Sequence, residues 1–153
     1  MRKAVCILRP DGNSGVSGIV EFVEKEDHVS ITAEVTGLSR GLHGFHIHEF
    51  GDLREGCISA GAHYNPSNKT HAGPTDKIRH IGDLGNINSE SGKFSKFKLK
   101  DKLVKLSGEF SIIGRSMVVH ADEDDLGRGG DEESLKTGNA GARLACGVIA
   151  LAN

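Results

Sequence analysis

The chain lacks an excess of charge of either sign. Its 19 lysines and arginines face 21 aspartates and glutamates, which leaves a net charge of −2. A protein that binds nucleic acid usually carries a basic excess and a pI above about 9, so we expect no nucleic-acid partner. No apolar run approaches the roughly 20 residues that a membrane-spanning helix needs, and we therefore expect no membrane partner either.

The beginning of the chain also lacks the features of a secretion signal. In MRKAVCILRP the apolar run covers only residues 4–8, and no small-residue cleavage site follows it. We therefore expect a cytoplasmic protein. The length of 153 residues fits one domain that spans residues 1–153. A chain of this length buries roughly 70% of its unfolded surface, so it needs no metal or disulfide merely to fold.

Tryptophan is absent and proline occurs only three times, whereas glycine occurs 21 times. This is about twice the usual glycine content of roughly 7%. Because glycine weakens helices and favours turns, the composition favours an all-β fold. Residues 28–36, HVSITAEVT, alternate strictly between apolar and other side chains, which is typical of a strand with one buried face.

Further short strands are predicted from apolar segments separated by turn signals such as Asp11-Gly12-Asn13. These strands cover residues 4–8, 15–23, 93–99, 102–106, 116–120 and 144–151. Many short strands with regular turns predict a β-sandwich or a small barrel.

Two long stretches, residues 50–82 and 121–141, are rich in glycine and polar residues and show no sustained periodicity. Loops longer than about 12–15 residues are uncommon in compact domains and are usually functional or disordered. The first stretch holds His63, His71 and His80, and Asp83 follows directly after it. Metal ligation would order such a stretch without a hydrophobic core of its own.

The chain has eight histidines, and two of them form an HxH pair on a predicted strand. His46 and His48 are two residues apart, so their imidazoles point to the same face and both can reach one metal ion. Alone this pair is a weak signal. Together with His120, which ends another apolar strand, and the three histidines of the first long stretch, it indicates a metal site.

Counting the donors suggests how such a site is arranged. Six histidines and Asp83 give seven groups, whereas two four-coordinate sites need eight donor positions. One imidazole that bridges two metals through both ring nitrogens would supply the eighth position. Spacing alone leaves other carboxylates open as ligands: Asp52, Asp76, Asp122, Asp124 and Asp125.

Two histidines and one cysteine are interpreted as outside this set. His43 has the opposite strand parity to His46, so we expect a structural hydrogen-bonding role unless Gly44 introduces a bulge. His28 borders a polar turn and is expected to be solvated. Cys6 alternates within the first strand and is interpreted as a small buried hydrophobic residue.

Five segments together identify a family. They are GFHIHEFGD (44–52), SAGAHYNP (59–66), RHIGDLGN (79–86), VVHADEDDLGRGG (118–130) and GNAGARLACGVIA (138–150). In this order they closely resemble copper/zinc superoxide dismutase over nearly the whole chain. The resemblance implies an all-β fold, an eight-stranded Greek-key β-barrel or sandwich with two long functional loops, in agreement with the strand pattern. Ala62 and Tyr64 depart from the proline and phenylalanine of many members.

The resemblance also implies how the donors divide between two metals. The copper ligands would be His46, His48, His63 and His120. The zinc ligands would be His63, His71, His80 and Asp83, with His63 as the bridging imidazolate. Three histidines and a carboxylate suit a closed structural zinc site, and imidazoles with an open position suit a copper ion that changes oxidation state. Asp124 would accept hydrogen bonds from His46 and His71; the alternative is one more solvated acid.

The activity that the resemblance implies is an oxidoreductase activity, the dismutation of superoxide to dioxygen and hydrogen peroxide. Copper would be reduced and reoxidised in turn, with His63 and Arg143 as catalytic residues and His63 as the proton donor. A net-negative protein needs a local positive field to attract an anion. The implied guidance residues are Glu132, Glu133, Lys136, Thr137 and Arg143. The alternative for this segment is a solvated helical turn capped by Asp131.

Three further expectations rest on the resemblance. Cys57 and Cys146 would form a disulfide, although free thiols are usual in a cytoplasmic protein. The chain would form a homodimer, and a copper chaperone would be a further candidate partner. The expected dimer contact includes Phe50, Gly51, Ile113 and Gly114, with Ala150 in place of a common glycine.

Two rival functions are less consistent with the sequence. A copper chaperone for superoxide dismutase carries an extra metal-transfer domain with a CxxC-type motif, and this chain has neither the motif nor room for the domain. A metal-storage or structural module could dispense with Arg143 or with some of the copper histidines, yet all of them are present.

Overall fold

The computed structural model describes all residues from Met1 to Asn153, and almost all regular structure in it is β-strand. Its two helices, η1 and η2, are single turns of 3-10 helix at Ile58–Ala60 and Glu133–Leu135. Neither helix has the length and hydropathy that a membrane crossing requires. The strands are β1 (Lys3–Pro10), β2 (Ser17–Glu24), β3 (Val29–Thr36), β4 (Gly41–His48), β5 (Arg54–Cys57), β6 (Asp83–Ser89), β7 (Phe94–Asp101), β8 (Ser116–His120) and β9 (Arg143–Leu151).

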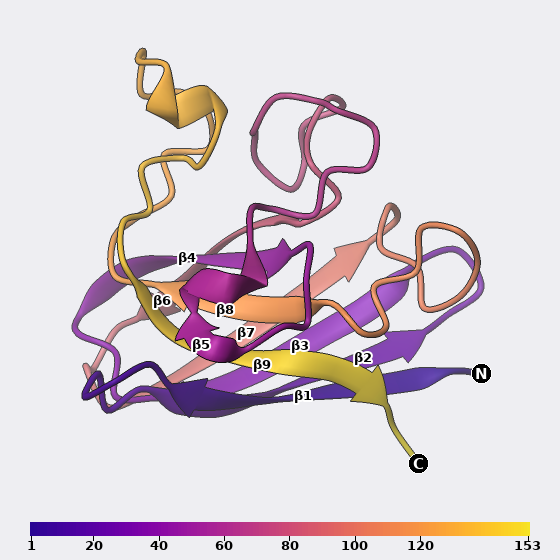
Figure 1. Ribbon diagram of the computed structural model, residues 1–153, viewed down its shortest axis with the longest axis horizontal. Coiled ribbons are helices and arrows are strands. Elements are labelled where there is room, and N and C mark those ends of the chain that lie inside the picture. Colours follow the sequence, from indigo (N-terminus) through magenta and orange to yellow (C-terminus); the bar gives the residue numbers. More distant parts are fainter.

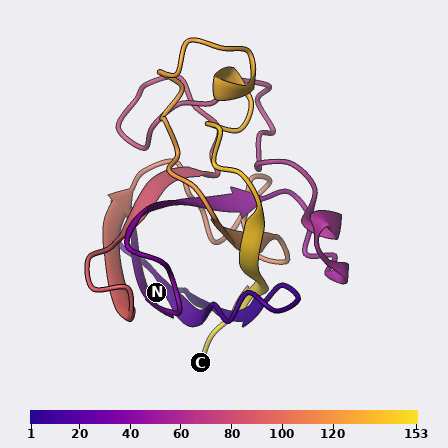
Figure 2. The ribbon, with the colours of Figure 1, turned by 90° about the vertical axis from the view of Figure 1, so that its left-hand side faces the viewer.

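Eight of these strands form one antiparallel sheet in the order β6-β4-β8-β9-β1-β2-β3-β7, and β5 lies outside it. The sheet curls until its two edge strands, β6 and β7, lie next to each other, so the barrel is nearly closed (Figure 2). The consecutive strands β3 and β4 are not neighbours in the sheet, because the chain crosses one end of the barrel between them. The predicted all-β Greek-key fold is confirmed.

Alternation along the strands fills the barrel with apolar side chains. In β3 the buried positions are Val29, Ile31, Ala33 and Val35, as the period of two predicts. They belong to a core of 23 buried residues. Cys6 is a free thiol within this core, and burial raises its pKa to about 12. The prediction that it serves as a small buried hydrophobic residue is confirmed.

Tyr64 also belongs to this core and is only 3% exposed. The guanidinium of Arg115 lies over its ring, 3.9 Å from the ring centroid, which is the geometry of a cation–π contact. The phenolic oxygen is buried and has no hydrogen-bond partner. The ring and its hydroxyl are therefore both buried, with a charged guanidinium over the ring face.

The strand predicted at residues 102–106 is wrong. The chain leaves β7 at Asp101, whose Oδ1 accepts hydrogen bonds from the backbone N–H groups of Leu103 and Val104 at 2.8 and 2.9 Å. This local turn takes the amides that a strand ladder would need. Val104 and Leu106 are buried from an irregular loop, so their alternation reflects core packing without strand pairing.

Two strands were missed because their sequences are polar. β6, DLGNINS, contains few apolar side chains, yet it pairs with β4. Its Ser89 is buried with its hydroxyl directed at the carbonyl oxygen of Leu38, 3.4 Å away. The short β5, REGC, lies inside the stretch 50–82 that shows no periodicity. A strand whose polar groups are satisfied inside the protein leaves no apolar alternation in the sequence.

A disulfide joins Cys57, at the end of β5, to Cys146 in β9, 89 residues further along the chain. The predicted pairing is confirmed. The bridge attaches the beginning of the first long stretch to the barrel wall. Together with the buried Ala60 and Val118, the two half-cystines form a small second hydrophobic cluster.

This bridge predicts a large loss of stability on its removal. Replacing both cysteines by serine should lower the free energy of unfolding by about 4–5 kcal/mol, because the unfolded chain loses a closed loop of about 90 residues. The measurement is urea unfolding of the metal-free protein, with the reduced wild-type protein as the control. Equal midpoints for the oxidised wild type and the double variant would contradict this prediction.

Candidate metal centre

All seven predicted donors lie together, and the two long stretches that follow β4 and β8 project from the same side of the barrel (Figure 1). The strands β4 and β8 supply the pair from the HxH motif and the histidine that ends the VVH segment, and β6 begins with the carboxylate. The first long stretch supplies the rest. No donor is more than 5% exposed: His46, His48, His63, His71, His80, Asp83 and His120. Burial of this many ionisable groups is costly unless each has a partner.

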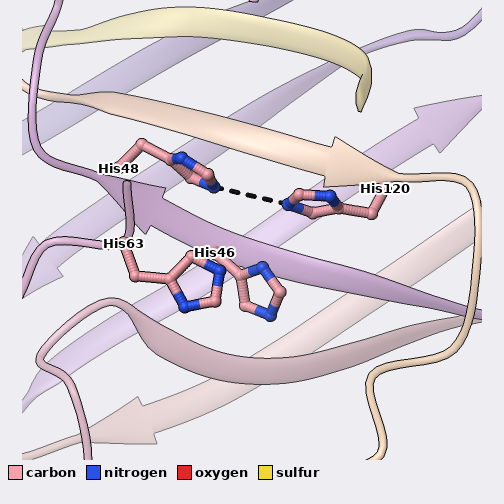
Figure 3. A group of neighbouring side chains, drawn as sticks. All are labelled: His46, His48, His63 and His120. Atoms are coloured by element: carbon pink, nitrogen blue, oxygen red, sulfur yellow. Dashed lines mark hydrogen bonds between the residues drawn. The ribbon is translucent and has the colours of Figure 1, made fainter. Parts of the chain in front are cut away.

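The donors form two clusters, in each of which the ligand atoms lie within 4.8 Å of one another. The first, here the four-histidine cluster, consists of His46, His48, His63 and His120, whose rings gather at one point (Figure 3). The second, here the Asp83 cluster, consists of His63, His71, His80 and Asp83. His63 belongs to both, which is the sharing that the donor count suggested.

Backbone carbonyls fix which ring nitrogens in the four-histidine cluster are free. His48 Nδ1 donates to Gly61 O at 2.8 Å, and His120 Nδ1 donates to Gly141 O at 3.1 Å. Because a carbonyl only accepts, the Nε2 atoms of both rings carry lone pairs, and they lie 3.3 Å apart. Two nitrogen ligands about 2.0–2.1 Å from one ion at a tetrahedral angle are about 3.3 Å apart. The spacing therefore fits a shared metal ion.

Two further nitrogens in this cluster have no partner at all. His46 Nε2 donates to Asp124 Oδ2 at 2.7 Å, which leaves its Nδ1 buried and unpaired. His63 Nε2 is likewise buried and unpaired. An unsatisfied buried polar atom costs about 1–3 kcal/mol. A metal ion held by these atoms would remove both deficits, so the residues fit such an ion.

In the Asp83 cluster one carboxylate oxygen faces three imidazoles. Asp83 Oδ1 lies 2.7 Å from His71 Nδ1, 3.0 Å from His80 Nδ1 and 3.1 Å from His63 Nδ1. The far nitrogen of His80 donates to the carbonyl oxygen of Lys69 at 3.0 Å. Three imidazole nitrogens and one carboxylate oxygen therefore converge, which is the donor set of a closed structural zinc site.

Burial and neighbouring charges set the protonation of these groups. Burial holds the pKa of His46 and of His48 well below the ordinary value and lowers that of His120 to about 4. These rings are neutral near pH 7, the form that binds metals. Burial alone would lower the pKa of His71, but hydrogen bonds to Asp124 and Asp83 raise it to about 9. Burial would raise the pKa of Asp83, but its histidine partners hold it far below its usual range.

Asp124 connects the two clusters. It is 1% exposed, and its Oδ1 accepts from His71 Nε2 at 2.7 Å while its Oδ2 accepts from His46 Nε2 at 2.7 Å. Both rings therefore point their Nδ1 atoms towards the metal positions. Of the other carboxylates left open by the sequence, Asp52, Asp76, Asp122 and Asp125 belong to neither cluster.

Two residues that hold Asp124 in place had no role in the sequence analysis. Asn86, in β6, accepts the backbone N–H of Asp124 through Oδ1 at 2.7 Å and donates from Nδ2 to its carbonyl oxygen at 2.9 Å. At Gly138, φ is +72°, and a Cβ there would collide with the Asp124 carboxylate and with His71. Both positions stand inside segments that identified the family, but nothing in their spacing points to Asp124.

A cavity of about 1020 Å³ opens above the four-histidine cluster. Arg143 lines it, half-buried, and donates from Nη1 to the carbonyl oxygen of Cys57 at 2.9 Å. Burial lowers the pKa of this guanidinium, although a guanidinium keeps its charge in proteins. The disulfide at Cys57 thereby also fixes the acceptor that orients Arg143.

The other residues predicted to guide the substrate border the same cavity, with one exception. Glu133, Lys136 and Thr137 line it, and Thr137 Oγ1 donates to Glu133 Oε1 at 3.0 Å. Glu132 does not line the cavity but pairs with Lys136 at 2.9 Å. The segment also forms the helical turn that was the alternative interpretation. Asp131 Oδ1 accepts the backbone N–H of Ser134 in η2 at 2.8 Å.

Two histidines lie outside both clusters, as expected. His43 is buried, with Nδ1 2.8 Å from the carbonyl oxygen of His120 and Nε2 2.8 Å from that of Ser39. The strand register does shift between Gly44 and His46, yet His43 still takes a structural role. His28 lies 2.6 Å from Asp27, and its side chain is 18% exposed, so it is less solvated than expected.

Comparisons with known proteins agree with this geometry. The model of the family described as copper/zinc superoxide dismutase (SODC) matches residues 16–149. "Superoxide dismutase [Cu-Zn] A" of Xenopus laevis is 56% identical over 150 residues, which cover 97% of each chain. "Superoxide dismutase [Cu-Zn]" of Saccharomyces cerevisiae is 51% identical over 156 residues and covers both chains fully.

A relative whose name places it outside the cell is similar to the same extent. The "Extracellular superoxide dismutase [Cu-Zn]" of Brugia pahangi is 53% identical over 151 residues, which cover 97% of this chain and 75% of that relative. Family likeness therefore does not decide the compartment. The family model covers most of the chain, and these relatives match it at 51–56% identity. The chain belongs to the copper/zinc superoxide dismutase family.

Proposed function

We propose that this chain is a superoxide dismutase, an oxidoreductase that converts two superoxide ions and two protons into dioxygen and hydrogen peroxide. The observation that carries this function is the pair of buried donor clusters that share His63 beneath an open cavity. Arg143 places a positive charge in the same cavity, where an anion would arrive. A storage module would need neither the cavity nor this charge.

We assign copper to the four-histidine cluster and zinc to the Asp83 cluster. The four-histidine cluster contains only imidazole donors, and three of them, His48, His63 and His120, line the cavity. Imidazoles suit copper, whose part when bound is one-electron chemistry. The Asp83 cluster contains a carboxylate and three imidazoles, the set that a closed zinc site uses. Two of its members, His71 and Asp83, do not line the cavity.

The protein groups around these positions bind, orient and protonate the substrate. The guanidinium of Arg143 attracts and orients superoxide, since its position is fixed by the Cys57 carbonyl. His63 directs Nδ1 into one cluster and Nε2 into the other. Its Nε2 is the atom that can hold a proton beside the substrate position and pass it to the reduced oxygen species, because it has no protein partner.

We also propose the setting in which this single domain, residues 1–153, acts. A homodimer would cover the exposed apolar side chains Phe50, Val148 and Leu151, which are 53%, 41% and 64% exposed. Ala150 lies between the last two and would pack at that contact. We place the protein in the cytoplasm, and a copper chaperone would deliver the ion to the four-histidine cluster.

Metal content and activity test the assignment together. Protein reconstituted with both metals should hold one copper and one zinc per chain and should consume superoxide. His120→Ala should lose copper and activity but keep zinc, because His120 belongs only to the four-histidine cluster. His28→Gln removes a histidine from outside both clusters and is the matched control. Elemental analysis beside a superoxide-consumption assay decides, and one metal per wild-type chain would contradict the shared-ligand arrangement.

Asp124→Asn should weaken the retention of both metals by about 10–100-fold, because the carboxylate orients two imidazoles and raises their basicity. The zinc position should suffer as well as the copper position, since Asp124 contacts His71 and His46. Competition with a chelator measures the affinities. Glu123→Gln, at the exposed neighbouring acid, is the control. Unchanged affinities in Asp124→Asn would show that the carboxylate does not orient the ligands.

Arg143→Ala should lower kcat/KM at least tenfold, a loss of about 1.4 kcal/mol, while both metals stay bound. Arg143→Glu should be slower still because it repels the anion, and Lys136→Ala should lose less because Lys136 is exposed and paired with Glu132. Added salt should slow the wild type, since the Debye length is about 8 Å at physiological ionic strength. Arg40→Ala controls for net charge. Wild-type rates and salt dependence in Arg143→Ala would refute the steering role.

A further inference from the structure

A second concave site lies outside the metal centre. A cavity of about 310 Å³, here the basic cavity, is enclosed by residues 65–69, by residues 77–81 and by the loop that follows β7. The basic residues on its wall are Lys69, Lys77, Arg79, Lys102 and Lys105. No aspartate or glutamate lines it. Asn65 and Lys69 also border the larger cavity, but the proposed function of the chain assigns no role to any residue of this wall.

The lysines of the basic cavity form no ion pair with the protein. The four lysines of its wall have no carboxylate within 4.0 Å, whereas the lysine beside the metal cavity, Lys136, pairs with Glu132. Asp101, which precedes Lys102 in the chain, is 3% exposed and is engaged by Arg79, 2.7 Å away, and by two backbone N–H groups. The pKa of Asp27 is lowered by its hydrogen bond with His28 and also by the charge of Lys102, which forms no ion pair with it. Four lysines without an ion-pair partner therefore line a concavity of a chain whose net charge is −2. A concave wall of one sign concentrates the field and attracts counter-ions.

The wall is built on a fixed frame. Arg79 and Asp101 form a buried ion pair, each 2% exposed at the side chain. Arg79 further donates to the carbonyl oxygens of Pro74, His80 and Ile81 at 2.6, 3.0 and 3.1 Å. Lys105 Nζ donates to the carbonyl oxygen of Lys102 at 2.9 Å, which holds two of the cationic residues together. One side of the concavity is therefore held by a buried ion pair and by backbone hydrogen bonds.

Part of the wall is apolar. Leu103 and Phe110 border the basic cavity and are each 43% exposed. An exposed aromatic ring beside several ammonium groups suits a ligand that has a phosphate chain and a flat ring. An inorganic phosphate chain would use the lysines alone.

We propose that the basic cavity binds an oligophosphate group, a chain of two or more linked phosphates. Such a chain carries three or four negative charges, which match the four lysines, and ammonium groups are common ligands of phosphate oxygens. The volume lies at the lower end of the roughly 300–1,000 Å³ that small-molecule sites occupy. A nucleoside triphosphate and an inorganic triphosphate share this chemistry and differ at the Phe110 wall.

The test is a calorimetric titration of the metal-loaded protein with inorganic tripolyphosphate. Lys102→Gln/Lys105→Gln should weaken binding at least tenfold, and added salt should weaken wild-type binding more steeply than that of the double variant. Lys93→Gln removes the same kind of charge at the opposite end of β7 and should bind like the wild type. Metal content is measured after each titration, because tripolyphosphate also chelates metals.

Arg143→Ala separates this site from the metal cavity and should leave the affinity unchanged. Loss of binding in Arg143→Ala, wild-type affinity in the lysine double variant, or no binding by the wild type at millimolar tripolyphosphate would each overturn the proposal.

Comparison of adenosine triphosphate with tripolyphosphate identifies the source of the phosphate chain. Tighter binding of the nucleotide, lost in Phe110→Ala, supports the site and assigns it to nucleotides. Equal affinities that Phe110→Ala does not change support the site and assign it to inorganic chains. Binding of the nucleotide that survives in Lys102→Gln/Lys105→Gln would overturn the proposal, because the lysines would then not be the phosphate ligands.

Discussion

The hydrogen bonds of the Asp124 carboxylate are the contacts on which the metal centre depends. One oxygen holds an imidazole from β4, and the other holds an imidazole from the first long stretch. A carboxylate only accepts hydrogen bonds when ionised, so it keeps a proton on Nε2 of His46 and of His71. The opposite nitrogens of His46 and His71 are thereby directed inwards before any ion arrives. Both oxygens of this buried charge and its backbone are satisfied, the latter by Asn86, which offsets the cost of burying it.

The barrel and the loops contribute differently to this arrangement. Neighbouring strands β4 and β8 fix three imidazoles on rigid backbone, which gives the four-histidine cluster its precision. The first long stretch has no core of its own and is held by the Cys57–Cys146 bridge, by β5 and by the contacts around Asp83. Much of its order is therefore expected to come from the ions that its histidines hold, since binding free energy at such sites also stabilises the folded state.

Sequence patterns predicted the parts of the fold in which local periodicity and tertiary packing agree. The alternation of residues 28–36 and the HxH pair point to faces that the barrel does bury. The pattern failed at residues 102–106, where the side chain of Asp101 captures the amides of a would-be strand. It also failed at β6, whose polar residues are satisfied internally. The donor count predicted a shared imidazole, but the assignment of each ligand to copper or zinc required the family motifs. The backbone acceptors Gly61 O and Gly141 O could not be predicted from the sequence, because every residue type has a backbone carbonyl.

The phenolic oxygen of Tyr64, buried without a partner next to His63, has a consequence for how this chain can change over evolutionary time. An unpaired buried hydroxyl costs about 1–3 kcal/mol, and Tyr64 belongs to the hydrophobic core. Proteins need only exceed the stability that function demands, so such costs persist when other interactions offset them. The barrel thus tolerates this cost at the residue next to its shared ligand. Replacement of Tyr64 by phenylalanine would remove the oxygen atom, and selection for a more stable enzyme could favour it.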